Sequence, residues 1–237
     1  TVKPRIKNDA VVFEDNGLTD ERLREIEHIH IIGCGSALHA GMVGKRVIEA
    51  MCRIRCTAEV ASEFRYENPI IGKKDMCIVI SQSGETADTL AAMRLAKQAG
   101  AFTIAIVNVV SSTIAREADG VLYTWAGPEI SVATTKAYSA QLSALYLISV
   151  KIARVRGLIS IGAELQRLPE CIEQTLKCQS DMQRIATLYA NRSSVFFLGR
   201  GLDYAAALEA SLKLKEISYI HSEAYAAGEL KHGTISL

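Results

Sequence analysis

Short apolar runs alternate with longer segments of mixed polarity along most of this chain. Residues 76–80 (MCIVI) are continuously apolar and include β-branched side chains, a pattern typical of a strand buried on both faces. A polar turn follows, and residues 86–99 are rich in strong helix formers and stop at Gly100. The pattern therefore predicts a strand–turn–helix unit here.

The same pattern recurs on both sides of this unit. Further strands are predicted at residues 29–32, 57–61, 102–107 and 121–125, and further helices at residues 37–52, 113–118 and 137–156. Strands that alternate with helices at this spacing favour an α/β fold with a parallel sheet covered on both faces.

The second half of the chain is more helical. Residues 163–189 are predicted to be a helical segment, with mixed charge and a Leu/Ile periodicity that suits a connector or a dimer-packing helix. A strand at residues 195–198 and a helix at residues 203–219 follow. We therefore divide the chain into a lead-in or linker (1–26), a first domain (27–156), a helical connector (157–192) and the start of a second domain (193–237).

The start of the second domain repeats the start of the first at one constant offset along the chain. The matched pairs are Gly33 with Gly199, Gly35 with Gly201, Ala61 with Ala227 and Glu63 with Glu229. Two separate matches at one offset predict an internal repeat of a whole α/β module. The counterpart of the polar turn after residue 80 would lie beyond residue 237, so we expect the second module to be incomplete.

Composition narrows the class of protein. The 237 residues are 49% hydrophobic and 22% charged, with a formal net charge of +1, which indicates a globular protein and argues against disorder or a nucleic-acid partner. No apolar run approaches the roughly 20 residues that span a bilayer, and the first residues lack a signal-peptide core. We expect a cytoplasmic protein without membrane contact.

The six cysteines are scattered, and only Cys52 and Cys56 are close in sequence. A single C-x3-C without a histidine pair is weak evidence for zinc. We predict no metal site and no cofactor. His28, His30, His39 and His221 are assigned structural or surface roles.

The polar turn after residue 80 is the first candidate site. It contains Ser81, Gln82, Ser83 and Thr86, with a flexible Gly84 between them. Hydroxyls and free backbone N–H groups at a helix start favour an anion, so we interpret the turn as a phosphate site. The alternative is an ordinary capped helix start, because Ser and Thr are common caps whatever the function.

A second loop follows the strand at residues 29–32 and reads Gly33-Cys34-Gly35-Ser36. The third glycine of a dinucleotide-binding fingerprint is absent, so no nucleotide is predicted. Ligands of parallel sheets lie beyond the carboxyl ends of the strands. We therefore expect Ser36 and the Ser81 turn to converge on one edge.

A polar group lies on the predicted helix 203–219. Glu209, Lys213 and Glu216 have the i, i+4, i+7 spacing of one helix face, among apolar neighbours. A carboxylate and an amine in a partly dry site are suited to proton transfer, whereas the alternative is a solvated surface pair. His232 lies beside Gly233 on a predicted loop, where it is either presented to a ligand or inert.

At this point the residues show a resemblance to a known family. The segments that carry it are IIGCGSALHAG, ASEFRY, SQSGETADTL, ISVATTKAY and LGRGLDYAAALEASLKLKEISYIHSEAYAAGELKHG. Together they resemble the isomerase half of the glutamine–fructose-6-phosphate aminotransferases, which is built from two sugar isomerase (SIS) domains. The resemblance runs from about residue 27 to residue 237.

The resemblance implies a three-layer sandwich with a five-stranded parallel sheet, followed by the opening part of a second SIS domain. It implies that fructose 6-phosphate, or the product glucosamine 6-phosphate, is bound. The implied ligand-binding residues are Ser81, Gln82, Ser83 and Thr86 for the phosphate, and Ser36, Val132 and Thr134 for the sugar.

The resemblance also implies catalytic roles and partners. Glu216 would move a proton between C1 and C2 of the open-chain sugar, Lys213 would assist beside it, and His232 would help to open the ring in the neighbouring subunit of a homodimer. Ammonia would come from a glutaminase domain in the full-length protein. Because that domain and the family's C-terminal tail are absent from these 237 residues, we expect sugar-phosphate binding without the complete synthesis.

Two other functions remain open from the sequence. One is a different SIS isomerase or a sugar-phosphate deglycase. The other is a sugar-phosphate sensor in a transcription regulator, which would need the Ser81 turn but not Glu216, Lys213 and His232 together.

Overall fold

The computed structural model describes residues 1–8, 10–13, 16–158 and 161–236. It divides into two compact units, Thr1–Ser160 and Ile161–Leu237. Residues 159 and 160, which fall in the predicted connector, lie outside the described residues, as do residues 9, 14 and 15 of the predicted lead-in.

The first unit contains the parallel sheet that the sequence predicts. Its elements are η1 (Lys3–Arg5), β1 (Ile6–Lys7), β2 (Ala10–Val11), α1 (Asp20–Glu25), β3 (His28–Gly33), α2 (Ser36–Cys52), β4 (Arg55–Val60), α3 (Ala61–Phe64), β5 (Asp75–Ser81), α4 (Ala87–Gln98), β6 (Phe102–Val107), α5 (Thr113–Glu117), β7 (Gly120–Tyr123) and α6 (Lys136–Val155). Strands β3 to β7 form a five-stranded sheet in the order β4-β3-β5-β6-β7, with parallel pairing throughout. The predicted α/β fold is confirmed.

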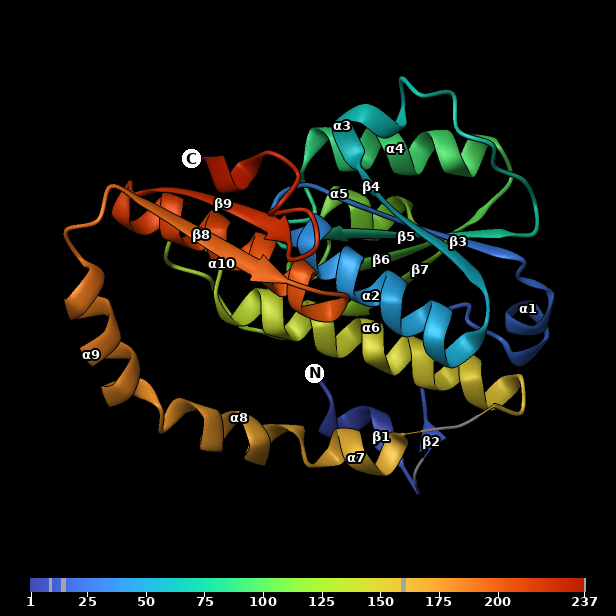
Figure 1. Ribbon diagram of the computed structural model, residues 1–237. Helices are drawn as coiled ribbons and strands as arrows, with labels where there is room; N and C mark the ends of the chain where they lie inside the picture. The colour runs from blue at the N-terminus through green and yellow to red at the C-terminus, as the bar shows by residue number, and fades with distance from the viewer. Residues whose placement is uncertain (9, 14–15, 159–160, 237) are drawn as a thin grey trace. The chain divides into compact units, whose positions relative to one another are not determined.

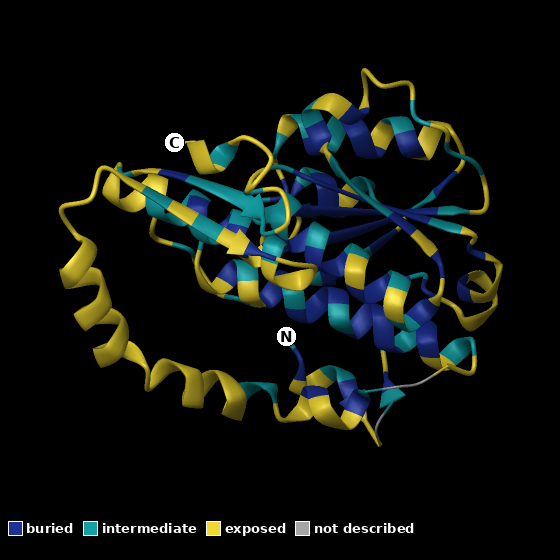
Figure 2. Ribbon diagram, in the orientation of Figure 1, coloured by how far each residue is buried: buried dark blue, intermediate teal, exposed yellow. Residues whose placement is uncertain are grey.

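Two hydrophobic cores lie on opposite faces of this sheet. Along β5, Met76, Ile78 and Ile80 belong to the core that α2 and α6 cover, whereas Cys77 and Val79 belong to the core that α3, α4 and α5 cover (Figure 1). The side chains alternate because successive residues of a strand point to opposite faces. Burial on both faces explains why residues 76–80 read as one continuous apolar run (Figure 2).

The segment that the sequence assigns to a lead-in takes part in the first of these cores. Leu18, Leu23 and Ile26 pack in the core that α2 and α6 cover. Thr19 starts α1 by accepting a hydrogen bond from the Arg22 N–H at 3.3 Å. Because its apolar residues are sparse and stand among charges, the sequence of this segment did not predict its packing.

The second unit begins with helices over the segment that the sequence predicts to be helical. Its elements are α7 (Gly162–Gln166), α8 (Leu168–Leu176), α9 (Gln179–Tyr189), β8 (Ser194–Gly199), α10 (Leu202–Ser218), β9 (His221–Ala226) and η2 (Thr234–Ser236). The segment predicted to be helical over residues 163–189 is helical, but it is divided into α7, α8 and α9. Pro169 lies in the first turn of α8, where its missing N–H is tolerated, and it could not continue the helix before it.

The internal repeat is confirmed residue by residue. Strands β3 and β8, helices α2 and α10, and strands β4 and β9 have equal lengths, and all of their bounds are related by the offset that takes Gly33 to Gly199. Both helices begin after a glycine of positive φ, 54° at Gly35 and 57° at Gly201, a conformation that costs glycine little. In each copy the two strands pair in parallel.

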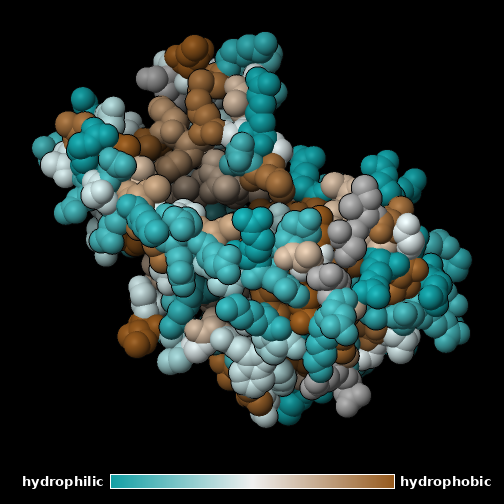
Figure 3. Space-filling view, turned by 90° about the horizontal axis from the view of Figure 1, so that it is seen from below, coloured by the Kyte–Doolittle hydropathy of each residue, from teal (hydrophilic) through white to brown (hydrophobic). Residues whose placement is uncertain are grey.

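Helices α8 and α9 contain no buried residue among those described (Figure 2). Exposed apolar side chains of α9 include Met182, Ile185 and Leu188. The face drawn in Figure 3 is mostly hydrophilic, but hydrophobic side chains gather in one part of it. None of the helices in the described part of the chain has the length and apolarity to cross a bilayer.

Candidate functional site

The Ser81 turn lies where the direction of the chain through the sheet reverses. From β3 the chain moves to β4 on one side, whereas β5, β6 and β7 follow on the other side. The loops after β3 and β5 therefore emerge side by side, and the Cys34 thiol lies 4.0 Å from the Thr89 hydroxyl. Such a reversal point is where open α/β sheets bind ligands.

Three hydroxyls and two backbone N–H groups are gathered in this turn. The Ser81 and Thr86 hydroxyls are 2.9 Å apart, and the Gly84 N–H donates to Ser81 Oγ at 3.0 Å. The Glu85 N–H donates to Ser83 Oγ at 3.2 Å. Ser81 itself is buried, so the hydrogen bonds to its hydroxyl hold the turn against the interior of the unit.

Gly84 is required by the shape of the turn. Its φ is 68°, and a Cβ at this position would lie 2.0 Å from Ser112 Oγ. The Gly84 carbonyl accepts from the Ile114 N–H at 3.0 Å, and the Glu85 carboxylate accepts from the Thr113 N–H at 2.7 Å. Sequence reasoning missed this support by the residues around α5, although the pair Ser112-Thr113 before a short helix is a visible helix-start signal.

Thr86 is the N-cap residue of α4, but its side chain accepts no capping hydrogen bond. Its hydroxyl bonds to Ser81 instead. The first N–H groups of a helix have no partner within the helix, and they carry the positive end of its dipole. The Thr86 side chain therefore does not cap α4, and the anion site stays a prediction.

The other residues expected to bind the sugar lie on two further loops. Ser36 is the first residue of α2 and is half-buried, and it follows β3, the strand next to β5. Thr134 is half-buried, and Val132 is 98% exposed, between β7 and α6. Because β6 separates β7 from β5 in the sheet, this segment is farther along the same edge.

The polar group of α10 lies on one helix face as the spacing predicts. Lys213 Nζ is 2.5 Å from Glu216 Oε2 and 3.6 Å from Glu209 Oε1. The side chains of Glu209, Lys213 and Glu216 are 9%, 19% and 30% exposed. The lysine therefore bridges a buried carboxylate, Glu209, and one at the exposed end of the same helix, Glu216.

His232 lies in a turn after β9 and is exposed. Its backbone N–H donates to the Glu229 carbonyl at 2.9 Å, and the next residue, Gly233, has a φ of 115°. Among residues 161–236, no hydrogen bond or ion pair of the structure joins His232 to Lys213 or Glu216.

The cysteines of the first unit are mostly held as thiols. Burial raises the pKa of Cys52 to about 12, and it also raises the pKa of Cys56 and of Cys77. Cys52 Sγ donates to the Ser149 carbonyl at 3.2 Å. These buried thiols are poor nucleophiles.

Comparisons with known proteins agree with this fold. The protein-family model of the SIS domain matches residues 22–151 and 188–237 of this chain. The glutamine–fructose-6-phosphate aminotransferase (isomerizing) of Caldanaerobacter subterraneus subsp. tengcongensis is 56% identical over 244 aligned residues, and that of Clostridium tetani is 55% identical. Each alignment takes in 100% of this chain and 40% of the relative, so the chain spans about two fifths of the length of these relatives.

A solved structure extends the agreement to three dimensions. The C-terminal domain of glucosamine-fructose-6-phosphate aminotransferase from Francisella tularensis superposes with a TM-score of 0.93 at 37% identity, covering 98% of this chain and 67% of that one. The two matched segments of the SIS domain begin at residues 22 and 188, which are related by the same offset as the two copies of the repeat. The chain therefore belongs to the SIS domain family, and within it to the isomerase half of the glutamine–fructose-6-phosphate aminotransferases.

Proposed function

We propose that this chain is the sugar-isomerising part of an enzyme that makes glucosamine 6-phosphate from fructose 6-phosphate and glutamine-derived ammonia. Its relatives at 56% and 55% identity carry the name of that enzyme. A glutaminase domain elsewhere in the full-length protein, a homodimer and a cytoplasmic location belong to the same proposal.

The single observation that carries the proposal is the uncapped start of α4. Thr86 leaves the first N–H groups of α4 without its side-chain cap, while the Ser81, Ser83 and Thr86 hydroxyls lie within the same turn. A phosphate group offers several acceptor oxygens and about two negative charges, which match these donors and the helix dipole. In the proposal, Gln82 adds its amide to this phosphate site.

The sugar lies next to the phosphate in the proposed complex. Ser36, Thr134 and the backbone of Val132 line it, since all three follow the carboxyl ends of strands in the same sheet. The exposure of Val132 suits a contact made through its backbone.

Proton transfer is assigned to the polar group of α10. The Glu216 carboxylate accepts the proton from C1 of the open-chain sugar and returns it to C2, and Lys213 holds that carboxylate in place through its 2.5 Å contact. His232 assists ring opening from its exposed turn in the partner's site. General acid–base groups of this kind contribute about 10²–10⁴-fold to a rate.

The phosphate site is tested by thermal unfolding of the full chain with millimolar fructose 6-phosphate, glucosamine 6-phosphate or fructose. The two phosphorylated sugars should raise the melting temperature, and fructose should not. Ser83→Ala and Thr86→Val should each weaken binding about 10- to 100-fold, because each removes one charge-assisted hydrogen bond.

Ser180→Ala on the exposed face of α9 is the matched control and should leave the ligand-dependent shift unchanged. The proposal fails if the phosphorylated sugars produce no shift, or if Ser83→Ala and Thr86→Val both retain the full shift.

A further inference from the structure

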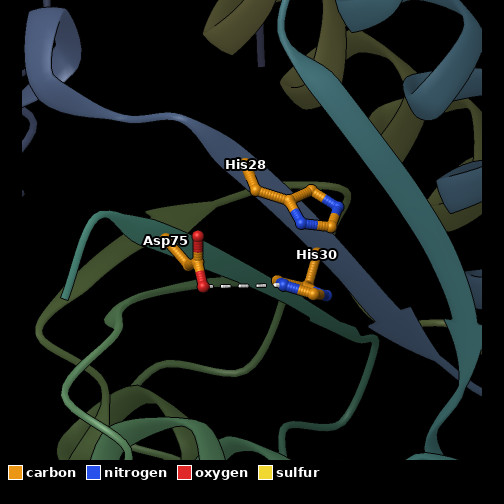
Figure 4. A group of neighbouring side chains, drawn as sticks. All are labelled: His28, His30 and Asp75. Atoms are coloured by element: carbon orange, nitrogen blue, oxygen red, sulfur yellow. Dashed lines mark ion pairs between the residues drawn. The ribbon is translucent and has the colours of Figure 1, made fainter. Parts of the chain in front are cut away.

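A second polar cluster lies at the opposite end of the sheet from the Ser81 turn. Strand β3 begins at His28 and β5 begins at Asp75, and these two residues are register partners in the parallel pair. His30 follows two residues later on the same face of β3. Figure 4 shows the Asp75 carboxylate directed at the His30 ring, with the His28 ring beside it.

His30 is oriented from behind by a carboxylate. Its side chain is 5% exposed, and Nδ1 lies 3.1 Å from both Glu59 Oε1 and Thr57 Oγ1. Because a carboxylate accepts hydrogen bonds, this contact places the proton on Nδ1 and leaves the lone pair on Nε2.

The other ring nitrogen of His30 has no hydrogen-bond partner among the described residues, although it is buried. It lies 4.0 Å from Asp75 Oδ2, too far for a hydrogen bond. Buried polar atoms are nearly always satisfied in folded proteins, so an unsatisfied nitrogen directed at a carboxylate indicates a missing ligand.

We propose that His28, His30 and Asp75 bind one divalent transition-metal ion, with Zn²⁺ as the representative metal. One ligand atom from each residue lies within 4.8 Å of the other two. In a tetrahedral zinc site with bonds of about 2.0–2.1 Å, ligand atoms are about 3.4 Å apart. The 4.0 Å separation of His30 Nε2 and Asp75 Oδ2 therefore needs a side-chain adjustment of under about 1 Å.

The surroundings of the three ligands resemble those of known metal sites. Metal-binding histidines commonly donate their second N–H to a carboxylate, as His30 does to Glu59. Asp75 Oδ2 is itself held by the Gly72 N–H at 2.6 Å. Three protein ligands leave the fourth position for water.

An entry path is present. A cavity of about 880 Å³ is lined in part by His28 and Asp75. Lys74 and four arginines, Arg24, Arg53, Arg55 and Arg156, also line it and oppose a cation, and of these Lys74 is paired with Glu27. The bound ion would connect the amino ends of β3 and β5, the two strands whose carboxyl ends lead into the Ser36 and Ser81 loops.

The full chain, stripped of metal with EDTA, provides the test. Isothermal titration with Zn²⁺ should show one site per chain, and the melting temperature should rise by about 5–10 °C at a hundredfold excess over Kd. The Co²⁺ complex should lack a sulfur-to-metal charge-transfer band, which separates this site from metal bound by the exposed Cys171 and Cys178.

His28→Gln and Asp75→Asn should each abolish the stoichiometric site, and both replace side chains that are not fully buried. Glu59→Gln should weaken Zn²⁺ binding about 10- to 100-fold. The matched control is His221→Gln, which removes a histidine near Glu223 in the second unit and should change nothing.

The proposal is overturned if no stoichiometric binding occurs, or if binding survives both His28→Gln and Asp75→Asn. It also fails if the Co²⁺ spectrum shows thiolate ligands. The melting temperatures of the metal-free variants are compared with that of the metal-free parent chain. Equal values show that a variant has lost the metal and not the fold.

Discussion

The two copies of the repeat share one backbone pattern but differ in how far it is buried. In the first copy, five of the six residues of β3 are buried, and α2 buries seven residues. In the second copy, β8 alternates between exposed and half-buried residues, and the four buried residues of α10 include Glu209 and Ser211. Within the described residues, β3 belongs to a five-stranded sheet and β8 to a two-stranded one, so the two copies are covered to different extents.

The difference is concentrated on one helix face. When the copies are aligned on Gly33 and Gly199, Lys213 takes the place of Val47 and Glu209 the place of Val43. Both valines are buried, whereas Lys213 and Glu209 form an ion pair at 3.6 Å. The same strand–turn–helix geometry therefore holds two buried valines in one copy and an ion pair in the other.

The largest expected effect comes from the second copy. In the full-length protein, Glu216→Gln should lower the rate of sugar isomerisation about 10²- to 10⁴-fold, because the amide cannot accept the proton. Hydrolysis of glutamine should be retained. The isomerisation rate is measured as the exchange of solvent deuterium into C1 and C2 of the sugar phosphate.

Its control is the same chemical change in the first copy. Glu49→Gln alters a half-buried carboxylate of α2 that contacts the Cys56 N–H at 3.4 Å, and it should change the isomerisation rate by no more than about twofold. An equal loss of isomerisation rate in Glu216→Gln and Glu49→Gln would mean that the two copies do not differ in their role in the reaction.

The second prediction transfers the charge of one copy to the other. Val47→Lys should destabilise the first unit by about 3–5 kcal/mol, because the new ammonium has Val43 rather than a carboxylate at the position equivalent to Glu209. Urea unfolding followed by the fluorescence of Trp125, the single tryptophan, measures the change in the first unit.

Ala50→Lys adds a lysine to the same helix at an exposed position and should cost no more than about 0.5 kcal/mol. Similar losses for the two variants would show that α2 is not the more tightly packed helix. The two copies would then differ in sequence but not in how tightly α2 and α10 are packed.

Local patterns were enough to predict the layered fold. Residues 76–80 and 102–107 are continuous apolar runs because both faces of their strands are covered, and the repeat of glycines at Gly33 and Gly199 revealed the second module. Strand β9 was missed because HSEAYA has no apolar run and its strand pairs only with β8 among the described residues.

The sequence predicts an anion site at the Ser81 turn, and this stays a prediction, but the sequence could not show whether Thr86 caps α4. Capping depends on where the Thr86 hydroxyl bonds, which is a tertiary fact. The His30 cluster was not predicted for the same reason, since Asp75 is distant in sequence and only the register of β3 with β5 brings it to the histidines.

The smallest expected effect concerns a thiol that the second copy lacks. Cys52 of α2 corresponds to Ser218 of α10. Cys52 is 1% exposed and donates to the Ser149 carbonyl, whereas Ser218 is exposed and bonds to Leu214 within its own helix. Cys52→Ser should therefore cost about 1 kcal/mol at about pH 7.5, because it buries a hydroxyl that makes one hydrogen bond in place of a less polar thiol.

This cost should shrink as the pH rises. Burial raises the pKa of Cys52 to about 12, whereas a thiol in the unfolded chain ionises near about pH 8.5. Between these values the folded parent chain binds more protons than the unfolded one, so its stability falls with pH by up to about 1.4 kcal/mol per unit, and Cys52→Ser removes that contribution. Urea midpoints of the two chains should therefore converge above about pH 7.5 and cross near about pH 9, where the parent chain has lost about 1 kcal/mol. A constant difference between the midpoints would show that Cys52 ionises as easily in the folded unit as in the unfolded chain, and that α2 is no better shielded from water at this position than α10.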